Sequence, residues 1–238
     1  MRLGLYYDLR NPGGARSWAR VYAAALDRIG WADRAGIGAI WVTEHHGFAD
    51  GYLPAPLTFC AAIATRTSRA RIGTAVVVSP LIPRPLPVWV GARGPRGARL
   101  AGRTGAGLLW IDRDLFEPYL AGLAEADPPA LPRVGGLANV FLADDPDRVL
   151  AAVREHGRRN RASYEDAGAA GRETAFPKLR ILTPAAAAAW ISELCAGLPV
   201  TDVFCFGDIG GLDDDLVERH TELAVRELAP VLAEEGEL

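Results

Sequence analysis

The stretch Ile40-Trp41-Val42-Thr43-Glu44-His45-His46 decides how the rest of the chain is interpreted. Its first four residues are apolar or β-branched, which is typical of a parallel strand that is covered on both faces. Three ionisable residues follow at once, and two of the four histidines of the chain are among them. Because α/β proteins keep their chemistry at the carboxyl ends of parallel strands, the stretch predicts a candidate catalytic site at the end of a central strand.

On both sides of this stretch, strand-like and helix-like patterns alternate. The expected strands are Arg2–Tyr7, Ala39–Thr43, Arg71–Val78, Val88–Gly91, Ala106–Ile111, Leu137–Ala143 and Thr201–Phe206. The expected helices are Trp18–Ala35 with Ser17 as its N-cap, Pro56–Thr67, Pro95–Arg103, Phe116–Ala126, Pro146–Arg161, Pro184–Ala196 and Asp213–Leu232. About seven strands in βα order predict one α/β domain over residues 1–238, a TIM-barrel-like sheet with somewhat fewer than the usual ~eight strands. An open, doubly wound sheet is the alternative.

One connection lacks its helix. Residues Pro80–Pro87 contain four prolines in eight positions, so no helix can form between the strands that flank them. A parallel pair of neighbouring strands needs a crossover of a dozen or more residues. The two strands are therefore not neighbours, or the sheet closes in an unusual way.

Composition excludes several classes of protein. The net charge of −3 among 238 residues lacks the basic footprint of a nucleic-acid or membrane-surface protein. We expect no signal peptide and no transmembrane segment. The three cysteines, Cys60, Cys195 and Cys205, fit neither zinc spacing nor a disulfide framework, which indicates reduced core residues in a cytoplasmic protein.

The residues after the central strand allow three interpretations. A histidine at this edge can act as a general base or acid, with Glu44 to orient it or hold it charged. A metal site is less favoured, because adjacent histidines at a strand end point apart and no third ligand stands out. The pair could also only satisfy backbone groups at the entry to a loop.

A glycine-rich turn, Gly91-Ala92-Arg93-Gly94-Pro95-Arg96-Gly97, forms a second candidate site. Backbone N–H groups at a helix N-terminus, with Arg93 and Arg96 to supply charge, would suit a phosphate. The turn matches neither the dinucleotide fingerprint nor the P-loop. The alternative is a tight βα turn in which glycine is needed for positive φ.

Three stretches together resemble the bacterial luciferase-like, flavin- or deazaflavin-dependent monooxygenase family. These are Trp41–His46 with the Leu53-Pro54-Ala55-Pro56 segment that opens the next helix, Arg71–Pro80, and Pro87–Gly91 with the helix that follows. Thr183-Pro184, Val203–Gly207 and the terminal helix also fit, so the resemblance covers nearly the whole chain.

The resemblance implies a β/α barrel that binds FMN or F420 at its C-terminal rim. His45 would be the catalytic histidine, with Glu44 and His46 supporting the pocket, and the Ala75–Val76 bond would match a non-prolyl cis peptide under the flavin ring. It also implies a homodimer, a small-molecule substrate and a flavin reductase as electron source. The residues assigned to the cofactor are Tyr6, Thr74, Ala75, Val76, Gly91, Arg93, Gly94, Arg96 and Gly97.

The sequence departs from the family pattern in two places. Full-length members carry a further strand–helix unit and a long insertion where Pro80 here runs almost directly into Pro87. The missing strand ends in an arginine-bearing turn that helps to bind phosphate, and Gly94 and Gly97 stand where the next phosphate turn carries hydroxyl residues. A similarly shortened relative is the non-fluorescent flavoprotein of luminous bacteria. The alternatives to an enzyme that uses a flavin are therefore a flavin carrier and an enzyme without a flavin.

Overall fold

The computed structural model describes residues 1–75, 88–164 and 179–235. Within these residues there are nine strands: β1 (Arg2–Tyr7), β2 (Ala39–Val42), β3 (Arg71–Thr74), β4 (Trp89–Val90), β5 (Gly107–Leu108), β6 (Val134–Leu137), β7 (Val140–Leu142), β8 (Arg180–Leu182) and β9 (Val200–Phe206). The same residues form eight α-helices: α1 (Trp18–Ala35), α2 (Pro56–Ala64), α3 (Pro95–Arg103), α4 (Phe116–Leu123), α5 (Pro146–Tyr164), α6 (Pro184–Cys195), α7 (Asp214–Leu223) and α8 (Ala229–Glu235). Short 3₁₀ turns lie at Pro12–Gly14 and Arg113–Leu115.

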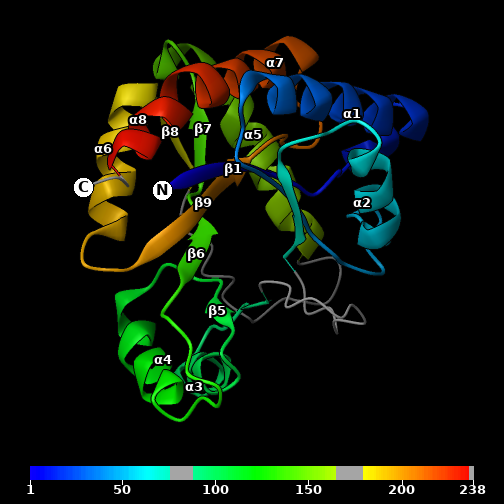
Figure 1. The fold of residues 1–238 in the computed structure, drawn as a ribbon. Coiled ribbons are helices and arrows are strands. Elements are labelled where there is room, and N and C mark those ends of the chain that lie inside the picture. The colour runs from blue at the N-terminus through cyan, green and yellow to red at the C-terminus, as the bar shows by residue number, and fades with distance from the viewer. Residues whose placement is uncertain (76–87, 165–178, 236–238) are drawn as a thin grey trace.

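The main sheet has seven parallel strands in the order β3-β2-β1-β9-β6-β5-β4, and it is curled into a half-barrel (Figure 1). β3 and β4 therefore lie at opposite edges of this sheet. The prediction that these two strands are not neighbours is confirmed, and strands that are not neighbours need no crossover helix between them. The predicted α/β, barrel-like architecture is confirmed.

The first βα unit shows how local sequence sets these elements. Ser17 caps α1 by accepting a hydrogen bond from the N–H of Arg20, and Gly36 ends the helix at a φ of 101°, in the left-handed region that glycine tolerates. Both ends of α1 lie where the sequence predicts them. The buried side of α1, with Val21, Ala25 and Ile29, packs on the convex face of the sheet.

The concave face of the sheet is filled by aromatic side chains. Trp41 of β2 lies over two glycine positions on its neighbouring strands, because a Cβ on Gly4 or Gly73 would come within about 3.0 Å of the indole ring. Trp89 of β4 lies in the same way over Gly107. The two indole rings meet edge to face with their centroids 6.2 Å apart. β2 is thus buried on both faces, as its sequence predicts.

The predicted strand Leu137–Ala143 is wrong as a single element. It is divided between β6, which belongs to the main sheet, and β7, which pairs in parallel with β8 in a separate two-stranded sheet. β8 is not among the expected strands. The run Leu137–Ala143 is continuously apolar apart from Asn139, and this pattern cannot reveal that the chain changes its pairing partner at Ala138 and Asn139.

His220 joins the two sheets. It is fully buried, accepts a hydrogen bond from the N–H of Leu142 on β7 at its Nδ1 (2.9 Å), and lies 2.6 Å from the carbonyl of Phe206 on β9 through its Nε2. Its ring also stacks on Phe141, with centroids 4.4 Å apart. Because Nδ1 accepts, the proton is on Nε2 and the ring is neutral. Burial lowers the pKa of His220 to about 4.

Two further predictions differ in detail. The expected terminal helix consists of α7, a π-helical turn at Ala224–Leu228, and α8. The wider turn lies just before Pro230, which has no N–H to donate and would clash with the preceding turn of a regular α-helix. All three cysteines are free; Cys195 and Cys205 are buried as expected, whereas Cys60 is only half-buried.

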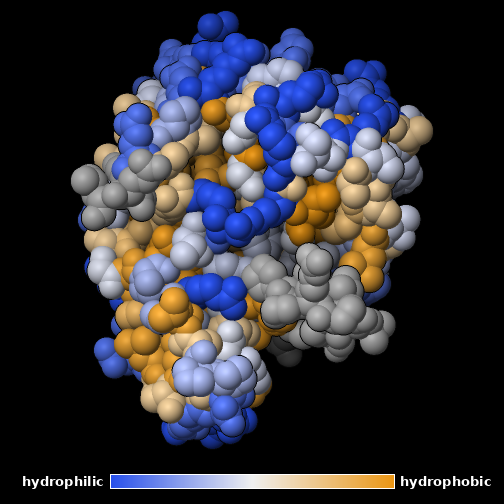
Figure 2. Space-filling view, viewed as in Figure 1, coloured by the Kyte–Doolittle hydropathy of each residue, from blue (hydrophilic) through white to orange (hydrophobic). Residues whose placement is uncertain are grey.

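The face of the molecule shown in Figure 2 carries both polar and apolar regions. Apolar residues reach it over the lobe formed by α3 and α4 and beside α2. The exposed large apolar side chains of the described residues are Trp18, Leu57, Leu100, Leu131 and Val231. No helix among the described residues is long and apolar enough to cross a membrane.

Candidate active site

His45 lies on the loop that follows β2, and backbone hydrogen bonds hold this loop against the end of β1. The N–H of His45 donates to the carbonyl of Leu53 (3.1 Å), and the N–H of Leu53 donates to the carbonyl of Asp8 (3.0 Å). At the strand end, the N–H of Thr43 donates to the carbonyl of Tyr7 (3.2 Å). The position of His45 is therefore fixed relative to two strands of the sheet.

The Glu44 carboxylate contacts His46, and it acts on His45 through its charge. Its Oε1 lies 2.9 Å from Nε2 of His46, and the His46 side chain is 68% exposed. The predicted carboxylate–histidine pair thus exists, but at the more exposed of the two histidines. Among the residues that the structure describes, no three His, Cys, Asp or Glu side chains converge as metal ligands.

The surroundings of His45 are aromatic. Its ring lies 4.0 Å from the ring of Tyr52 (centroid to centroid, 35° between planes) and 5.4 Å from that of Phe48. Behind Tyr52 lies the guanidinium of Arg10, with Cζ 3.8 Å from the centre of the Tyr52 ring. Arg10 is itself ion-paired with Asp8 (3.6 Å) and Asp50 (3.3 Å).

Sequence reasoning did not find this support. Asp8, Arg10, Phe48, Asp50 and Tyr52 lie between the expected strands and helices, where no motif marks them. A usable signal was present for the first two, because charged residues directly after a buried strand lie at the edge where α/β proteins place functional groups. No local signal marks Tyr52, since the loop brings it to His45 only in the fold.

The electrostatics of the site favour a neutral imidazole. Burial, together with the positive charges of Arg10, His46 and Arg93, lowers the pKa of His45 to about 4, and Glu44 opposes this shift. Burial raises the pKa of Asp8 to about 6 against the effect of Arg10. A neutral His45 offers one hydrogen-bond donor and one acceptor near neutral pH, and it is a weak general base in the free protein.

The glycine-rich turn after β4 does not match the alternative of a tight βα turn with glycines at positive φ. None of Gly91, Gly94 and Gly97 has a positive φ, so that expectation is wrong. Gly97 is needed for space instead, because a Cβ there would come within 3.0 Å of the Cβ of Ala92. α3 starts after Gly94 with no side-chain hydrogen bond at its N-cap. Its first N–H groups therefore have no side-chain cap and resemble an anion site.

The structure brings some of the predicted cofactor residues together. Arg93 lies 5.6 Å above the ring of Trp110, and its charge acts on His45 from the opposite edge of the curled sheet.

Tyr6 is in the concave aromatic cluster, where its ring stacks on that of Phe204 at 5.4 Å. Thr74 and Ala75 lie at the end of β3, next to β2. Arg96 is exposed on the first turn of α3. Val76, and with it the predicted cis bond, lies outside the described residues.

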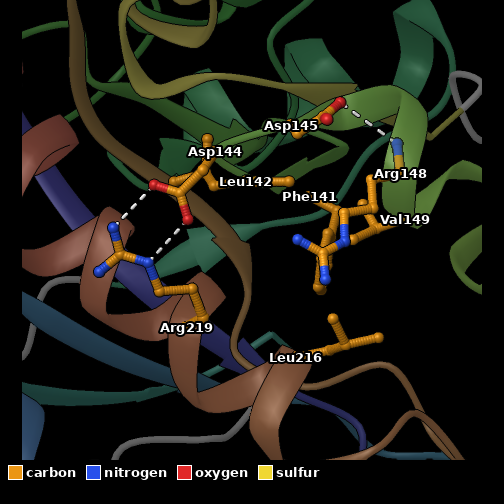
Figure 3. A pocket seen from close by; sticks show the side chains of 9 residues that line it. Phe141, Leu142, Asp144, Asp145, Arg148, Val149, Leu216 and Arg219 are labelled. Atoms are coloured by element: carbon orange, nitrogen blue, oxygen red, sulfur yellow. Dashed lines mark hydrogen bonds and ion pairs between the residues drawn. The ribbon is translucent and has the colours of Figure 1, made fainter.

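A separate pocket of about 220 Å³ lies between the end of β7, the start of α5, and α7 (Figure 3). Its floor is apolar, with Phe141 and Leu216 among its members, and its charged rim is largely paired within the protein. Asp144 accepts two hydrogen bonds from Arg219 (2.9 and 2.7 Å). The lining contains no histidine, cysteine or hydroxyl side chain. The residues around His45 are therefore the better candidate active site.

Comparison with known proteins places the chain in a family. The model of the luciferase-like monooxygenase family matches residues 1–83 and 79–192. A curated relative is the oxygenase component of the flavin-dependent trigonelline monooxygenase of Acinetobacter baylyi, which is 31% identical over 80 residues. This alignment covers 34% of the chain and only 22% of that relative.

Solved structures resemble the whole chain. Monooxygenase RslO1 from Streptomyces bottropensis superposes with a TM-score of 0.79 at 18% identity, covering 97% of this chain and 99% of that one. The oxygenating constituent of 3,6-diketocamphane monooxygenase from Pseudomonas putida, in complex with FMN, gives a TM-score of 0.60 at 14% identity, covering 97% and 98%. At such identities these likenesses show a shared fold alone.

Proposed function

Because the chain belongs to the luciferase-like monooxygenase family, we propose that it is a flavin-dependent monooxygenase that acts on a small organic substrate in bacterial secondary metabolism. FMN is the proposed cofactor and F420 the alternative. One observation carries the proposal: β2 and β4 approach across the curled sheet through the rings of Trp41 and Trp89, so the charge of Arg93, just before α3, acts on His45 at the end of β2. Two candidate sites that are 48 residues apart in sequence thereby become one.

The residues present suit a flavin phosphate. The first turn of α3 has no side-chain cap, and Arg93 and Arg96 flank it with positive charge. Backbone N–H groups at a helix N-terminus together with guanidinium groups form a donor set that suits a phosphate dianion. We therefore assign the phosphate to Arg93, Arg96 and the N–H of Gly97.

For the flavin ring we assign Tyr6, Thr74 and Ala75, which lie at or near the ends of β1 and β3. A reduced flavin bound there would supply the electrons with which dioxygen is activated. The aromatic cluster of Tyr6, Trp41 and Phe204 lies beneath this position and excludes water from the concave face. His45, held neutral, would hydrogen-bond to the substrate or exchange a proton with it at its imidazole nitrogens.

A non-catalytic flavin-binding protein is the second candidate. It is favoured by the open sheet, because no pairing joins β3 to β4 among the described residues. A sheet that strand pairing does not close could hold a cofactor without enclosing a substrate. Excluding water is one of the ways in which active sites protect reactive intermediates, so the missing pairing weakens the argument for turnover.

Cofactor titration tests the binding part of the proposal. We expect the purified protein to quench the fluorescence of FMN or F420 at micromolar concentration, and Arg93→Gln to weaken this affinity by about tenfold, as expected for the loss of a charge-assisted phosphate contact. Arg103→Gln, at the far end of α3, is the matched control and should leave the affinity unchanged. If neither FMN nor F420 binds, both candidates are contradicted, and an enzyme that does not use a flavin becomes the remaining alternative.

Turnover separates the two candidates. With reduced FMN and dioxygen supplied, an oxygenase converts a substrate, and His45→Ala lowers its rate, whereas a carrier shows only flavin release. If substrate conversion is found and His45→Ala leaves its rate unchanged, the role given to His45 is wrong. A flavin reductase is the proposed source of electrons, and it can be replaced in the assay by chemically reduced flavin.

The proposal includes a homodimer formed through α1 and α2. Trp18 on α1 and Leu57 on α2 are 42% and 60% exposed, and large apolar side chains at such exposure are often covered by a partner. Light scattering should therefore give twice the monomer mass, and Leu57→Lys should reduce it. A monomer at all concentrations would contradict this part of the proposal.

A further inference from the structure

Arg10, Tyr52 and His45 form a stack of three side chains, in which Tyr52 lies against both of the others. The guanidinium of Arg10 lies on one face of the Tyr52 ring, with Cζ 3.8 Å from its centre, and the imidazole of His45 lies 4.0 Å from the same ring. Phe48 closes the side of the stack, with its ring 5.3 Å from that of Tyr52 and 5.4 Å from that of His45. Guanidinium groups are attracted to aromatic faces, so the order of the stack is physically favourable.

The Arg10 end of the stack is fixed firmly. Arg10 is 3% exposed, and its partners Asp8 and Asp50 are 3% and 6% exposed. A buried charge needs such partners, because its desolvation is costly when it is unpaired. Leu9, between Asp8 and Arg10, has a φ of 55°, which is the left-handed region that a leucine rarely adopts. Backbone strain of this kind persists where the surrounding contacts impose it, and it is found most often near functional sites.

We propose that Arg10 and Tyr52 are positioning residues for His45: Tyr52 fixes the plane of the imidazole, and the charge of Arg10 opposes its protonation. The two stacking distances place the guanidinium within about 8 Å of the imidazole, where a like charge has a measurable effect in a partly buried site. The reaction that His45 serves is taken from the proposed function, whereas the positioning of His45 by Arg10 and Tyr52 does not depend on it.

Other charged groups also face His45. His46 and Glu44 flank it in the chain, and Arg93 approaches from the turn after β4. Asp8 and Asp50 lie behind Arg10 and would act on His45 in the opposite direction if Arg10 were absent. Removing Arg10 deletes a positive charge near His45, and this change favours the imidazolium. Asp8 adds little to it, because the charge of Arg10 opposes the raised pKa of the Asp8 carboxyl, which would protonate more readily once Arg10 is gone.

The stack is tested by following the histidine side chains of the purified protein with nitrogen-15 NMR between about pH 8 and pH 5, without cofactor. In the wild type, His45 should stay neutral throughout this range and show cross-relaxation to the Tyr52 ring. In Arg10→Met its midpoint should rise by about one pH unit or more, whereas Arg10→Lys, which keeps the charge, should hold the midpoint low. A purely structural role of Arg10 would not separate these two variants.

Tyr52 provides an independent arm. Tyr52→Phe keeps the ring and should leave the titration of His45 unchanged, whereas Tyr52→Leu removes the stack and should raise the midpoint as water reaches the imidazole. His220 is the internal reference, and its signal should not move in any folded variant. The proposal is overturned if the wild type lacks the His45–Tyr52 contact, or if folded Arg10→Met and Tyr52→Leu titrate like the wild type. Because no flavin is present, these outcomes are independent of the cofactor assay.

Discussion

Replacing His220 with glutamine should make the folded protein less sensitive to mild acid. His220 is fully buried between β7 and β9, and its pKa falls from 6.5 to about 4 on folding. The folded state thus binds this proton less readily than the unfolded state, and the stabilisation present above pH 6.5 is lost as the pH falls toward 4. For this shift the loss is about 1 kcal/mol by about pH 5.5 and about 3 kcal/mol by about pH 4.5.

The glutamine variant isolates this effect. Its amide can accept from the N–H of Leu142 and donate to the carbonyl of Phe206, as the imidazole does, but it does not titrate in this range. It will be less stable than the wild type at neutral pH, because it loses the stacking on Phe141. The quantity of interest is how the difference between the two proteins changes with pH.

The free energy of unfolding should be measured by urea titration, followed by tryptophan fluorescence, at several values between about pH 7.5 and pH 4.5. We expect the stability difference between wild type and His220→Gln to shrink steadily below pH 6.5. His46→Gln is the control for the loss of a histidine, since the His46 side chain is 68% exposed. Parallel pH profiles for the wild type and His220→Gln would refute the reasoning.

Two further predictions concern stability. Asp33 accepts hydrogen bonds from the backbone N–H groups of Ser68, Arg69 and Ala70, which hold its pKa at about 2, so Asp33→Ala should lower the free energy of unfolding by about 2–4 kcal/mol, and Asp33→Asn by less. A loss below about 0.5 kcal/mol in a urea titration would show that these N–H groups find other partners. Gly102→Ala should cost about 1–3 kcal/mol, because its Cβ would collide with the backbone of α4 at Tyr119, whereas Gly91→Ala, which meets nothing within 4 Å, should be nearly neutral. Equal thermal midpoints for these two variants would contradict the close approach of α3 to α4.

Local signals predicted those elements whose ends are set by local chemistry. Ser17 and Gly36 bound α1 correctly, and Thr183 with Pro184 marks the start of α6, because caps act within a few residues of themselves. β6 was missed in part because Gly135 and Gly136 are poor strand formers. Trp89 and Ile111 occupy the space that a Cβ would need there, which is a tertiary constraint that no sequence window contains.

The residues of the candidate site likewise fall into two groups: those that a local signal identifies, and those that only the fold brings to the site. His45 was found because it follows a recognisable strand, and Arg93 because it lies in a glycine-rich turn before a helix. The other contacts depend on how two loops pack at the ends of β1 and β2. This packing pairs Glu44 with His46 and places Tyr52 and Arg10 beside His45. Sequence reasoning can thus name reacting groups at strand ends, but it cannot name what orients them.

The effect of the Arg93 charge on His45 depends in turn on the curvature of the sheet. No strand pairing joins β3 to β4 among the described residues, so hydrogen bonds in the described sheet do not close it. The contact that spans the curl is between the indole rings of Trp41 and Trp89, each seated on glycines of adjacent strands. A side chain larger than hydrogen at Gly73 or Gly107 would lift one indole from its strand, and the two edges would then be free to move apart. The glycines beneath the two indole rings therefore contribute to the geometry of the site, together with the loops that carry its reacting groups.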